Sequence, residues 1–586
     1  MPSPQRLAEE LSEPLRRVLG WLASLRDAQG RIVCPEHGIE HTGKSAYVIV
    51  LCCELLKHDA QVDRAALVSL AREQGRRLVA NLVREGTSPC HTFRPGRHDP
   101  FNCSNSVIDG GACSDALAQL VSELGGELPA AEREAARAAS LLHARTYLRY
   151  AVLDKGIPAQ RAWGLTGLAG AWSLEHDPEL EQAAIEAVGV LEGIQHKDGS
   201  YPYHPLEWGA EHAGEADVSS FYHSRIPGFL IHALERMGRD PRSELFRGPI
   251  LRGLDFLQAL VGPDGRKPGL VEAKPWYWGA EYEVASHPFD IFALASGWRL
   301  FGRNSLGESA RASFREWVAH LGADGVPASH RPGAGRERSY QCPLFWAAHA
   351  AWIARAAREL DACLKLPERP VPVKGAIEIS VAWFADAQLA RLEDTDVVAW
   401  VRGARPAVNL HHGSPRGAGL VRVYSKRERR ELLAPAREAE WHGMAGGFAP
   451  ARGWRSGAGE LRFSAWLARV DLRAGRHAAA LARPVRVFSR GVLGYSSALV
   501  SSAFELAPHA TPLSDGILLQ RRLAHRDGTP LEQSRIERSF RIGGGALEVE
   551  ERLLDSGGAR GVEYHVPEAA RGLLREAGHV RYHLGS

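Results

Sequence analysis

A loosely repeated helical unit fills the first 364 residues and constrains the fold more than any other feature of the chain. An amphipathic helix is followed by a turn that ends in glycine, then by a loop rich in Pro, His and aromatic residues, and then by a more apolar helix. The glycines of four such turns are Gly30, Gly199, Gly265 and Gly325. We interpret each as the C-cap of its helix, because glycine reaches the left-handed conformation without strain. Repetition on this scale indicates an architecture assembled from helix pairs.

The second helix of each pair is Ala/Gly-rich or apolar nearly all round, as expected of a buried helix. Six such helices begin near Lys44, Ser104, Arg161, Ile226, His287 and Cys342. Their partners, such as RLAEELSEPLRRVLGWLASL, carry one charged face. Six amphipathic helices outside and six apolar helices inside predict an (α/α)6 toroid.

A proline-rich stretch, KLPERPVPVKG, separates two unlike halves of the chain. After it come short alternating runs, AIEISVAWF, DVVAWV, GLVRVYS and ALEVEERLL, which have the period of antiparallel strands. A chain of 586 residues also exceeds one ordinary core. We therefore expect an α+β multidomain protein with a catalytic α/α toroid over 1–364, a linker over 365–375 and an antiparallel β-sandwich over 376–586.

Charge and apolar runs narrow the class of partner. Because 72 basic residues nearly balance 69 acidic ones, nothing favours nucleic acid. No run approaches the roughly 18 apolar residues of a membrane span. The N-terminal stretch lacks the pattern of a signal peptide. We expect a cytoplasmic protein or, if a leader has been trimmed, a periplasmic or secreted one.

The cysteines indicate thiols and not a metal site. Cys52 and Cys53 are adjacent inside the apolar run AYVIVLCCELL, which predicts buried thiols and favours a reducing compartment. The eight cysteines include no CxxC pair. We expect neither a metal nor another cofactor.

Polar and aromatic residues gather directly before the apolar helices. In a toroid those helices start at one end, so the loops before them surround one mouth, where helix N-termini favour an anion. The segment SSFYHSRIPGF, for example, places a tyrosine, a histidine and an arginine within four residues. An aromatic, positively charged cleft of this kind suits an acidic polysaccharide or oligosaccharide.

Ordinary structural roles compete with this interpretation. Asn105 is well placed to be an N-cap, and Pro227, Pro288 and Pro343 fit a first helical turn. A single histidine is more often structural than catalytic. The recurrence of Tyr, His and Arg at successive openings of one ring favours a functional site.

The layout of a toroid followed by a β-sheet domain, with Asn, Tyr, His and Arg at the mouth, resembles the polysaccharide lyases of the heparinase II/III, alginate-lyase and chondroitin-lyase type. In those families an Asn or Arg neutralises the uronate carboxylate. A Tyr or His removes the C5 proton, and a Tyr protonates the leaving oxygen. The resemblance implies β-elimination on a uronic-acid-containing polysaccharide such as a glycosaminoglycan.

The resemblance also implies roles for individual residues. Asn105 would neutralise the carboxylate, with Arg225 or Arg161, and Tyr222 or His223 would be the base. The remaining tyrosine role would fall to Tyr222, Tyr282 or Tyr340. Substrate binding would involve Lys44, Arg161, Trp276, Trp278, His287 and Tyr340. The heparinase II/III type usually has a His-rich metal-binding stretch early in its β domain. Here NLHHGS, with His411 and His412, has no acidic partner at suitable spacing.

Other functions remain open, because fold alone does not decide chemistry. The same toroid hosts glycoside hydrolases, which need two carboxyl groups flanking the scissile bond. Candidates are Asp109, Glu207, Glu211, Asp217, Glu281, Glu283 and Asp290. Terpene cyclases share a helical toroid, but their clustered aspartates are absent from this sequence. A non-catalytic glycan-binding protein would use the same aromatic and arginine side chains.

Overall fold

The computed structural model describes most of the chain. The described residues are 8–35, 38, 40, 42–81, 104–154, 156–204, 216–270, 272–273, 282–327, 343–367, 379–404, 412–413, 418–433, 440–446, 499–525, 528–585 and parts of 465–488. By contact the chain forms two compact units. The helical unit is Met1–Pro205, Phe221–Val261 and Trp276–Pro367; the β unit is Leu206–Ser220, Gly262–Pro275 and Glu368–Ser586. The predicted domain limits at 364 and 376 remain a proposal.

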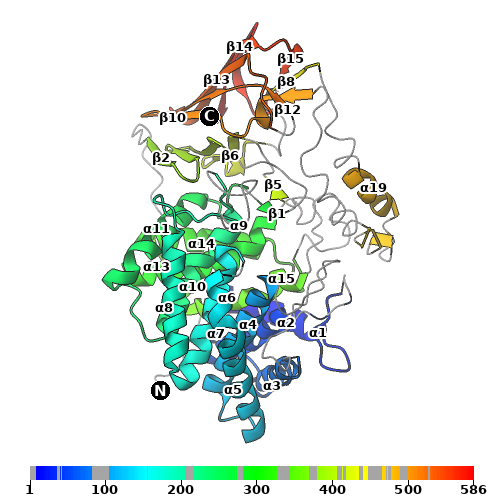
Figure 1. The fold of residues 1–586 in the computed structure, drawn as a ribbon, viewed down its shortest axis with the longest axis vertical. Coiled ribbons are helices and arrows are strands. Elements are labelled where there is room, and N and C mark those ends of the chain that lie inside the picture. The colour runs from blue at the N-terminus through cyan, green and yellow to red at the C-terminus, as the bar shows by residue number, and fades with distance from the viewer. Residues whose placement is uncertain are drawn as a thin grey trace. The chain divides into compact units, whose positions relative to one another are not determined.

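The six predicted apolar helices are present (Figure 1), and their mutual contacts close a circuit. Each packs against the next, and the last packs against the first. In that order they are α2 (Thr42–His58), α4 (Ser104–Leu124), α7 (Pro158–Glu175), α10 (Arg225–Arg236), α13 (His287–Phe301) and α16 (Ala350–Arg355), with α15 (Pro343–Ala348) directly before α16. This circuit is the toroid arrangement; the count of six helix pairs stays a prediction.

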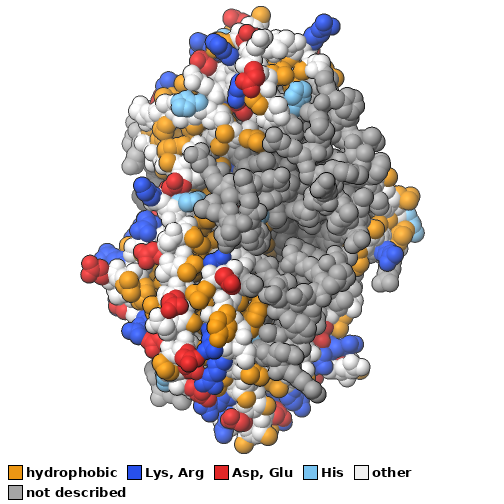
Figure 2. Space-filling view, in the orientation of Figure 1, with side chains coloured by type: hydrophobic (Ala, Val, Ile, Leu, Met, Phe, Trp, Pro, Cys, Tyr) orange, Lys and Arg blue, Asp and Glu red, His pale blue; other side chains and the backbone are white. Residues whose placement is uncertain are grey.

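A second set of helices packs on the outside of this circuit. These are α1 (Glu9–Ser24), α3 (Arg64–Ala80), α5 (Ala130–His143), α8 (Pro178–Gly193), α11 (Glu244–Leu260) and α14 (Asn304–Ala319). Shorter helical elements are η1 (Ala144–Leu148), α6 (Arg149–Asp154), α9 (Ser220–His223), η3 (Tyr282–Ser286) and α17 (Ala357–Leu364). On the face shown in Figure 2, basic and acidic side chains are interspersed over the described helices. Ion pairs between separate helical segments include Arg72–Glu132 and Arg145–Asp177.

The four repeated glycines have positive φ as predicted, between 75° and 87°, but they are not helix C-caps. Each lies beyond the end of its helix, in a turn that its own N–H closes on the carbonyl three residues earlier. The bond from Gly199 to His196 is 3.0 Å and that from Gly265 to Gly262 is 2.9 Å. A β-carbon at Gly199 would also lie 2.1 Å from the carbonyl oxygen of Arg252. Glycine is therefore required by the turn and by its close approach to an outer helix.

The predicted strands are present, and every strand pair in the β unit is antiparallel. One sheet has the order β10-β11-β13-β14-β17-β16, a second β2-β3-β4-β6-β7, a third β12-β9-β8-β15 and a fourth β1-β5. Leu392, Trp441 and Phe540 come from the three larger sheets and belong to one buried apolar cluster. The finer assignment of a sandwich stays a prediction. The strands are β1 (Glu272–Ala273), β2 (Ser380–Phe384), β3 (Leu389–Glu393), β4 (Val397–Arg402), β5 (His412–Gly413), β6 (Gly419–Ser425), β7 (Arg430–Glu431), β8 (Trp441–Met444), β9 (Leu499–Ser501), β10 (His509–Pro512), β11 (Gly516–Arg521), β12 (Ala524–His525), β13 (Ser534–Gly543), β14 (Ala546–Ser556), β15 (Arg560–Tyr564), β16 (Arg571–Glu576) and β17 (His579–Gly585).

Two further expectations concern cysteines and membranes. Cys52 and Cys53 are buried thiols of α2, and burial raises the pKa of both. In the part of the chain that the structure describes, no helix combines the length and apolarity needed to cross a membrane.

Candidate functional site

The first two turns of several inner helices meet around the indole ring of Trp163, which is buried in α7. The ring centre lies 5.2 Å from that of Phe229 in α10 and 5.3 Å from that of Phe289 in α13. His349, at the junction of α15 and α16, lies 5.8 Å away. The Trp163 Nε1 group donates a hydrogen bond to the hydroxyl of Tyr47 in α2. The expectation that the inner helices bring their starts to one end of the toroid is therefore correct for these helices.

Two cationic side chains lie against this aromatic cluster. The Nζ atom of Lys44 is 5.1 Å from the Trp163 ring centre and 5.5 Å from that of Tyr47. The guanidinium carbon of Arg225 is 5.4 Å from the Trp163 ring centre and 4.2 Å from that of Phe289. Lys44 is 2% exposed and Arg225 is 1% exposed. Aromatic faces attract cations most strongly when the cation is removed from water.

The pKa of His349 is affected by the charges of this cluster. Burial, followed by the charges of Lys44 and Arg225, lowers the pKa of His349 well below its usual range. The imidazole is therefore neutral at physiological pH, and the local charge comes from the lysine and the arginine. We call Lys44, Tyr47, Trp163, Arg225, Phe289 and His349 the cationic cluster. Two cationic side chains beside aromatic rings are an arrangement suited to an anionic group.

Tyr222 lies beside Arg225 and is half-buried. The guanidinium carbon of Arg225 is 5.0 Å from the centre of the Tyr222 ring. Tyr203 stacks on the same ring at 5.0 Å with an interplanar angle of 27°. Arg225 also donates a hydrogen bond to the carbonyl of Phe221. A phenol and a guanidinium from the SSFYHSRIPGF segment are thus held side by side.

His223 is directed elsewhere, although it is the next residue. Its Nε2 atom is 2.9 Å from the carbonyl oxygen of Gly253 in α11, so this nitrogen carries the hydrogen. Its ring packs against Phe256, also in α11, at 4.8 Å, and against Tyr201 at 5.7 Å. The two candidate bases therefore have different surroundings, and only Tyr222 is beside Arg225 in these contacts.

Two predicted substrate-binding residues contact groups close to them in the sequence. Arg161 donates to the carbonyl oxygens of Leu153 and Gly156 at 2.7 and 3.2 Å. The Nδ1 atom of His287 lies 3.6 Å from Oδ2 of Asp290, and both side chains are fully buried. The two hydrogen bonds of Arg161 brace the first turn of α7. Contact of Arg161 and His287 with a substrate stays a prediction.

The remaining predicted residues fall where the structure describes little. Asn105 lies in α4 and Tyr282 in η3, but their side chains are outside the described set, and Trp276, Trp278 and Tyr340 are outside it entirely. His411 is also outside, and the side chain of His412 is not described. Among the described residues no group of three or more His, Cys, Asp or Glu side chains could hold a metal ion.

Three carboxyl groups considered for hydrolysis are described. Asp109 is 6% exposed, and its Oδ1 atom would lie 2.2 Å from a β-carbon at Gly43, so it packs against the start of α2. Asp290 is adjacent to His287, as given above, and Asp217 is fully buried in the β unit. The side chains of Glu207, Glu211, Glu281 and Glu283 are not described.

Sequence reasoning missed four members of the cationic cluster: Tyr47, Trp163, Phe289 and His349. A partial signal existed, since Tyr47 follows Lys44 by three residues and therefore shares its helix face. No local signal marked His349, which lies inside the apolar run WAAHAAWIARAA.

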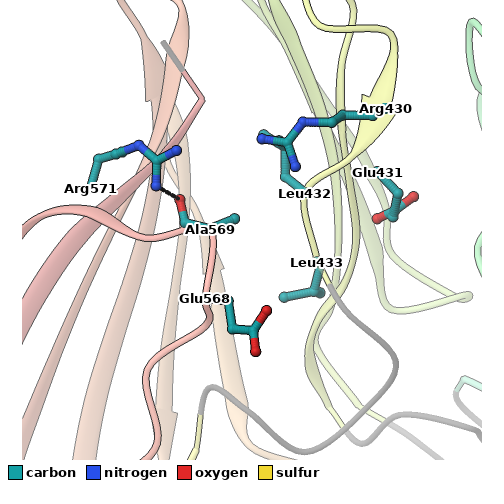
Figure 3. A pocket seen from close by; sticks show the side chains of 7 residues that line it. All are labelled: Arg430, Glu431, Leu432, Leu433, Glu568, Ala569 and Arg571. Atoms are coloured by element: carbon teal, nitrogen blue, oxygen red, sulfur yellow. Dashed lines mark hydrogen bonds between the residues drawn. The ribbon is translucent and has the colours of Figure 1, made fainter.

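A pocket of about 390 Å³ in the β unit differs from the cationic cluster in the residues that line it (Figure 3). Its described lining contains no aromatic residue, and both Arg430 and Glu431 are paired with opposite charges. Glu431 accepts from Arg422 at 2.9 Å, and Arg430 donates to Glu428 at 2.6 Å. It does not share the positive, aromatic character of the cationic cluster. The lining residues are Arg430, Glu431, Leu432, Leu433, Glu568, Ala569 and Arg571.

No protein-family model and no curated protein matches this chain. Among solved structures, a cellobiose 2-epimerase from Spirochaeta thermophila is 14% identical, with a TM-score of 0.45 over 61% of this chain and 97% of that one. A glycosyl hydrolase of family 88 from Bacteroides vulgatus is 12% identical, with a TM-score of 0.41 over 60% and 99%. A polysaccharide lyase is 11% identical, with a TM-score of 0.39 over 61% and 99%. At these scores the matches carry no argument, and function is argued from the site.

Proposed function

We propose that this protein is a carbohydrate-active enzyme that cleaves a uronic-acid-containing polysaccharide by β-elimination. The observation that carries the proposal is the position of Arg225, 5.0 Å from the ring of Tyr222 and 5.4 Å from that of Trp163, against which Lys44 also lies. A proton acceptor and two cations are thereby associated with one aromatic surface. Elimination from an acidic sugar needs a proton acceptor for the C5 proton and a cation for the carboxylate. The pyranose ring of such a sugar also stacks well on aromatic faces.

The chemistry assigns a role to each group. Arg225 and Lys44 pair with the uronate carboxylate and stabilise the negative charge that grows on it when the C5 proton leaves. The phenolate of Tyr222 accepts that proton. The electron pair of the broken C–H bond forms the C4=C5 double bond, and the bond to the glycosidic oxygen breaks. A proton from Tyr222 or Tyr282 then completes the leaving hydroxyl, and Asn105 assists at the carboxylate.

Ultraviolet absorbance tests the proposal, because the unsaturated product absorbs and a hydrolysis product does not. The protein is mixed with glucuronan, alginate, heparosan, hyaluronan, chondroitin and pectate. We expect absorbance to rise on at least one polymer. The rate of this increase should be about 10²- to 10⁴-fold lower with Tyr222→Phe. Tyr150→Phe is the matched control, since Tyr150 is 56% exposed on α6, and it should leave the rate unchanged.

Two other outcomes would replace the proposal. New reducing ends without absorbance would indicate a hydrolase, with Asp109 and Asp290 as the described carboxyl groups to substitute. Binding of a polymer without any product would indicate a glycan-binding protein.

A further inference from the structure

The segment that leads into Tyr222 and Arg225 is anchored by the β unit. Residues 206–220 belong to the β unit by contact, and the chain returns to the helical unit at Phe221. Within that segment, all residues from Ala216 to Ser220 are at most 2% exposed. The segment continues directly into α9, which carries Tyr222, and α10 begins at Arg225.

Ala216 is held at both of its backbone polar groups. Its N–H donates to the carbonyl of Asp386 at 3.1 Å, and its carbonyl accepts from Nη2 of Arg402, also at 3.1 Å. At the other end of the segment, Nζ of the buried Lys267 donates to the carbonyl of Ser220 at 2.7 Å. Three hydrogen bonds from three separate parts of the β unit therefore fix the few residues before the site.

Ala216 also has a backbone conformation that needs such support. Its φ is +63°, in the left-handed region that residues other than glycine rarely adopt. Strain of this kind persists where the surroundings determine the conformation, and it concentrates beside functional segments. Here the hydrogen bonds from Ala216 to Asp386 and from Arg402 to Ala216 hold this conformation in place.

The anchoring arginine sits on a rigid support. Arg402 ends β4, a central strand, where it is paired with Leu389 of β3 and Gly419 of β6. A second stretch, Gly262–Pro275, also belongs to the β unit although it lies between helical segments in the sequence. In it, the carbonyl of Arg266 accepts a hydrogen bond of 2.7 Å from Nη1 of Arg422 in β6. The next residue, Lys267, is the one that bonds to Ser220. Two sheet arginines thus bond to the carbonyls of Ala216 and Arg266, one in each of the two stretches that interrupt the helical unit in sequence.

We infer that Arg402 and Lys267 are positioning residues, which fix the backbone from Ala216 to Ser220, the residues that lead directly into α9 and the start of α10. Any effect of these residues on catalysis rests on the proposed function. Their effect on the backbone from Ala216 to Ser220 does not depend on that function. The planar guanidinium of Arg402 offers several donors in a fixed geometry, which suits its part of this task.

Hydrogen–deuterium exchange of the full chain tests the inference without an activity assay. We expect Arg402→Lys and Lys267→Met each to raise exchange about tenfold in peptides covering 216–229, with little change elsewhere. Arg521→Lys is the matched control. Arg521 is also a buried β-unit arginine that donates to backbone carbonyls, those of Ala418 and Ser502, but it does not contact this segment. It should leave exchange over 216–229 unchanged.

Kinetics add a second readout if a substrate polymer is found. Arg402→Lys should lower kcat about tenfold while KM changes less, and Arg521→Lys should change neither. Unchanged exchange in both test variants, or an equal rise across the whole chain, would overturn the inference. Failure of the polymer assay would overturn the proposed function and leave the exchange result to stand by itself.

Discussion

Asp115 of α4 and Arg355 of α16 form an ion pair of 2.7 Å between helices that α2 separates in the ring. Their side chains are 2% and 5% exposed. His232 of α10 lies 3.4 Å from the same carboxylate, and Gln119 of α4 accepts from Arg355 at 2.8 Å. Charged side chains from three inner helices, α4, α10 and α16, are therefore linked in one buried network.

Breaking this pair should destabilise the protein strongly. Asp115→Asn leaves the guanidinium of Arg355 buried without its charged partner, at a cost of about 3–5 kcal/mol in the free energy of unfolding. Urea unfolding followed by circular dichroism measures the change. Asp240→Asn, which removes an exposed pair with Arg242, is the control and should have no measurable effect. If both substitutions lowered the free energy of unfolding equally, burial would not explain the contribution of the Asp115–Arg355 pair.

The same network predicts loss of stability in acid. Burial alone would raise the pKa of Asp115, but the charges of Arg355 and His232 outweigh it and hold that pKa well below its usual range. A carboxyl whose pKa is lowered by folding stabilises the protein fully above its unfolded pKa of about 4, and this contribution is lost as pH falls further. The unfolding free energy should drop steeply below about pH 4. In Asp115→Asn this part of the pH dependence should be missing.

Lys44 should affect both substrate binding and the charge state of His349. Because Lys44 lowers the pKa of His349, Lys44→Met should raise that pKa, as measured by NMR titration with His349→Gln used for assignment. On an active polymer, KM should rise about 10- to 100-fold through loss of a charge-assisted contact. Lys57→Met is the control in the same helix, since Lys57 pairs with Glu54 and Glu123. A His349 titration indifferent to Lys44→Met would contradict the cationic cluster.

His223 should prove structural. His223→Gln should keep the rate of any elimination reaction within about twofold, because the imidazole bonds to Gly253 and not to the Tyr222–Arg225 pair. It should lower the unfolding free energy by about 1–3 kcal/mol, since the carbonyl of Gly253 loses its buried donor. The absorbance assay and thermal unfolding measure these effects. A loss of activity equal to that of Tyr222→Phe would instead make His223 the base.

The β unit should weaken as pH rises toward 8. Burial raises the pKa of Glu551 to about 7, although the charge of Arg538, whose Nε atom is 2.8 Å away, opposes the change. A carboxyl whose pKa is raised by folding contributes stability that is present below its unfolded pKa of about 4.3 and lost as pH rises through 7. Glu551→Gln should remove this decline. Exchange rates of β13 and β14 amides between pH 5 and 8, corrected for intrinsic exchange, measure it.

Much of the fold was predictable because its signals are local. The apolar helices at Lys44, Ser104 and Arg161 were found within a few residues of their bounds, since an all-round apolar pattern identifies a buried helix. The alternating runs GLVRVYS and ALEVEERLL became β6 and β14 for the same reason. Gly199 was correctly read as left-handed but wrongly as a C-cap, because the same φ serves a turn whose closing bond the sequence does not reveal.

The sequence by itself determined that a ring of helices would collect Tyr, His and Arg side chains at its helix starts. Only the tertiary structure decided which of them act together. It separated Tyr222 from His223, since the direction of neighbouring side chains in the short helix α9 depends on what packs against each. It brought Lys44, Arg225 and His349 to one indole ring, and Arg402 to the carbonyl of Ala216. These pairs lie far apart along the chain, so their contacts arise from packing and leave no periodic trace in the sequence.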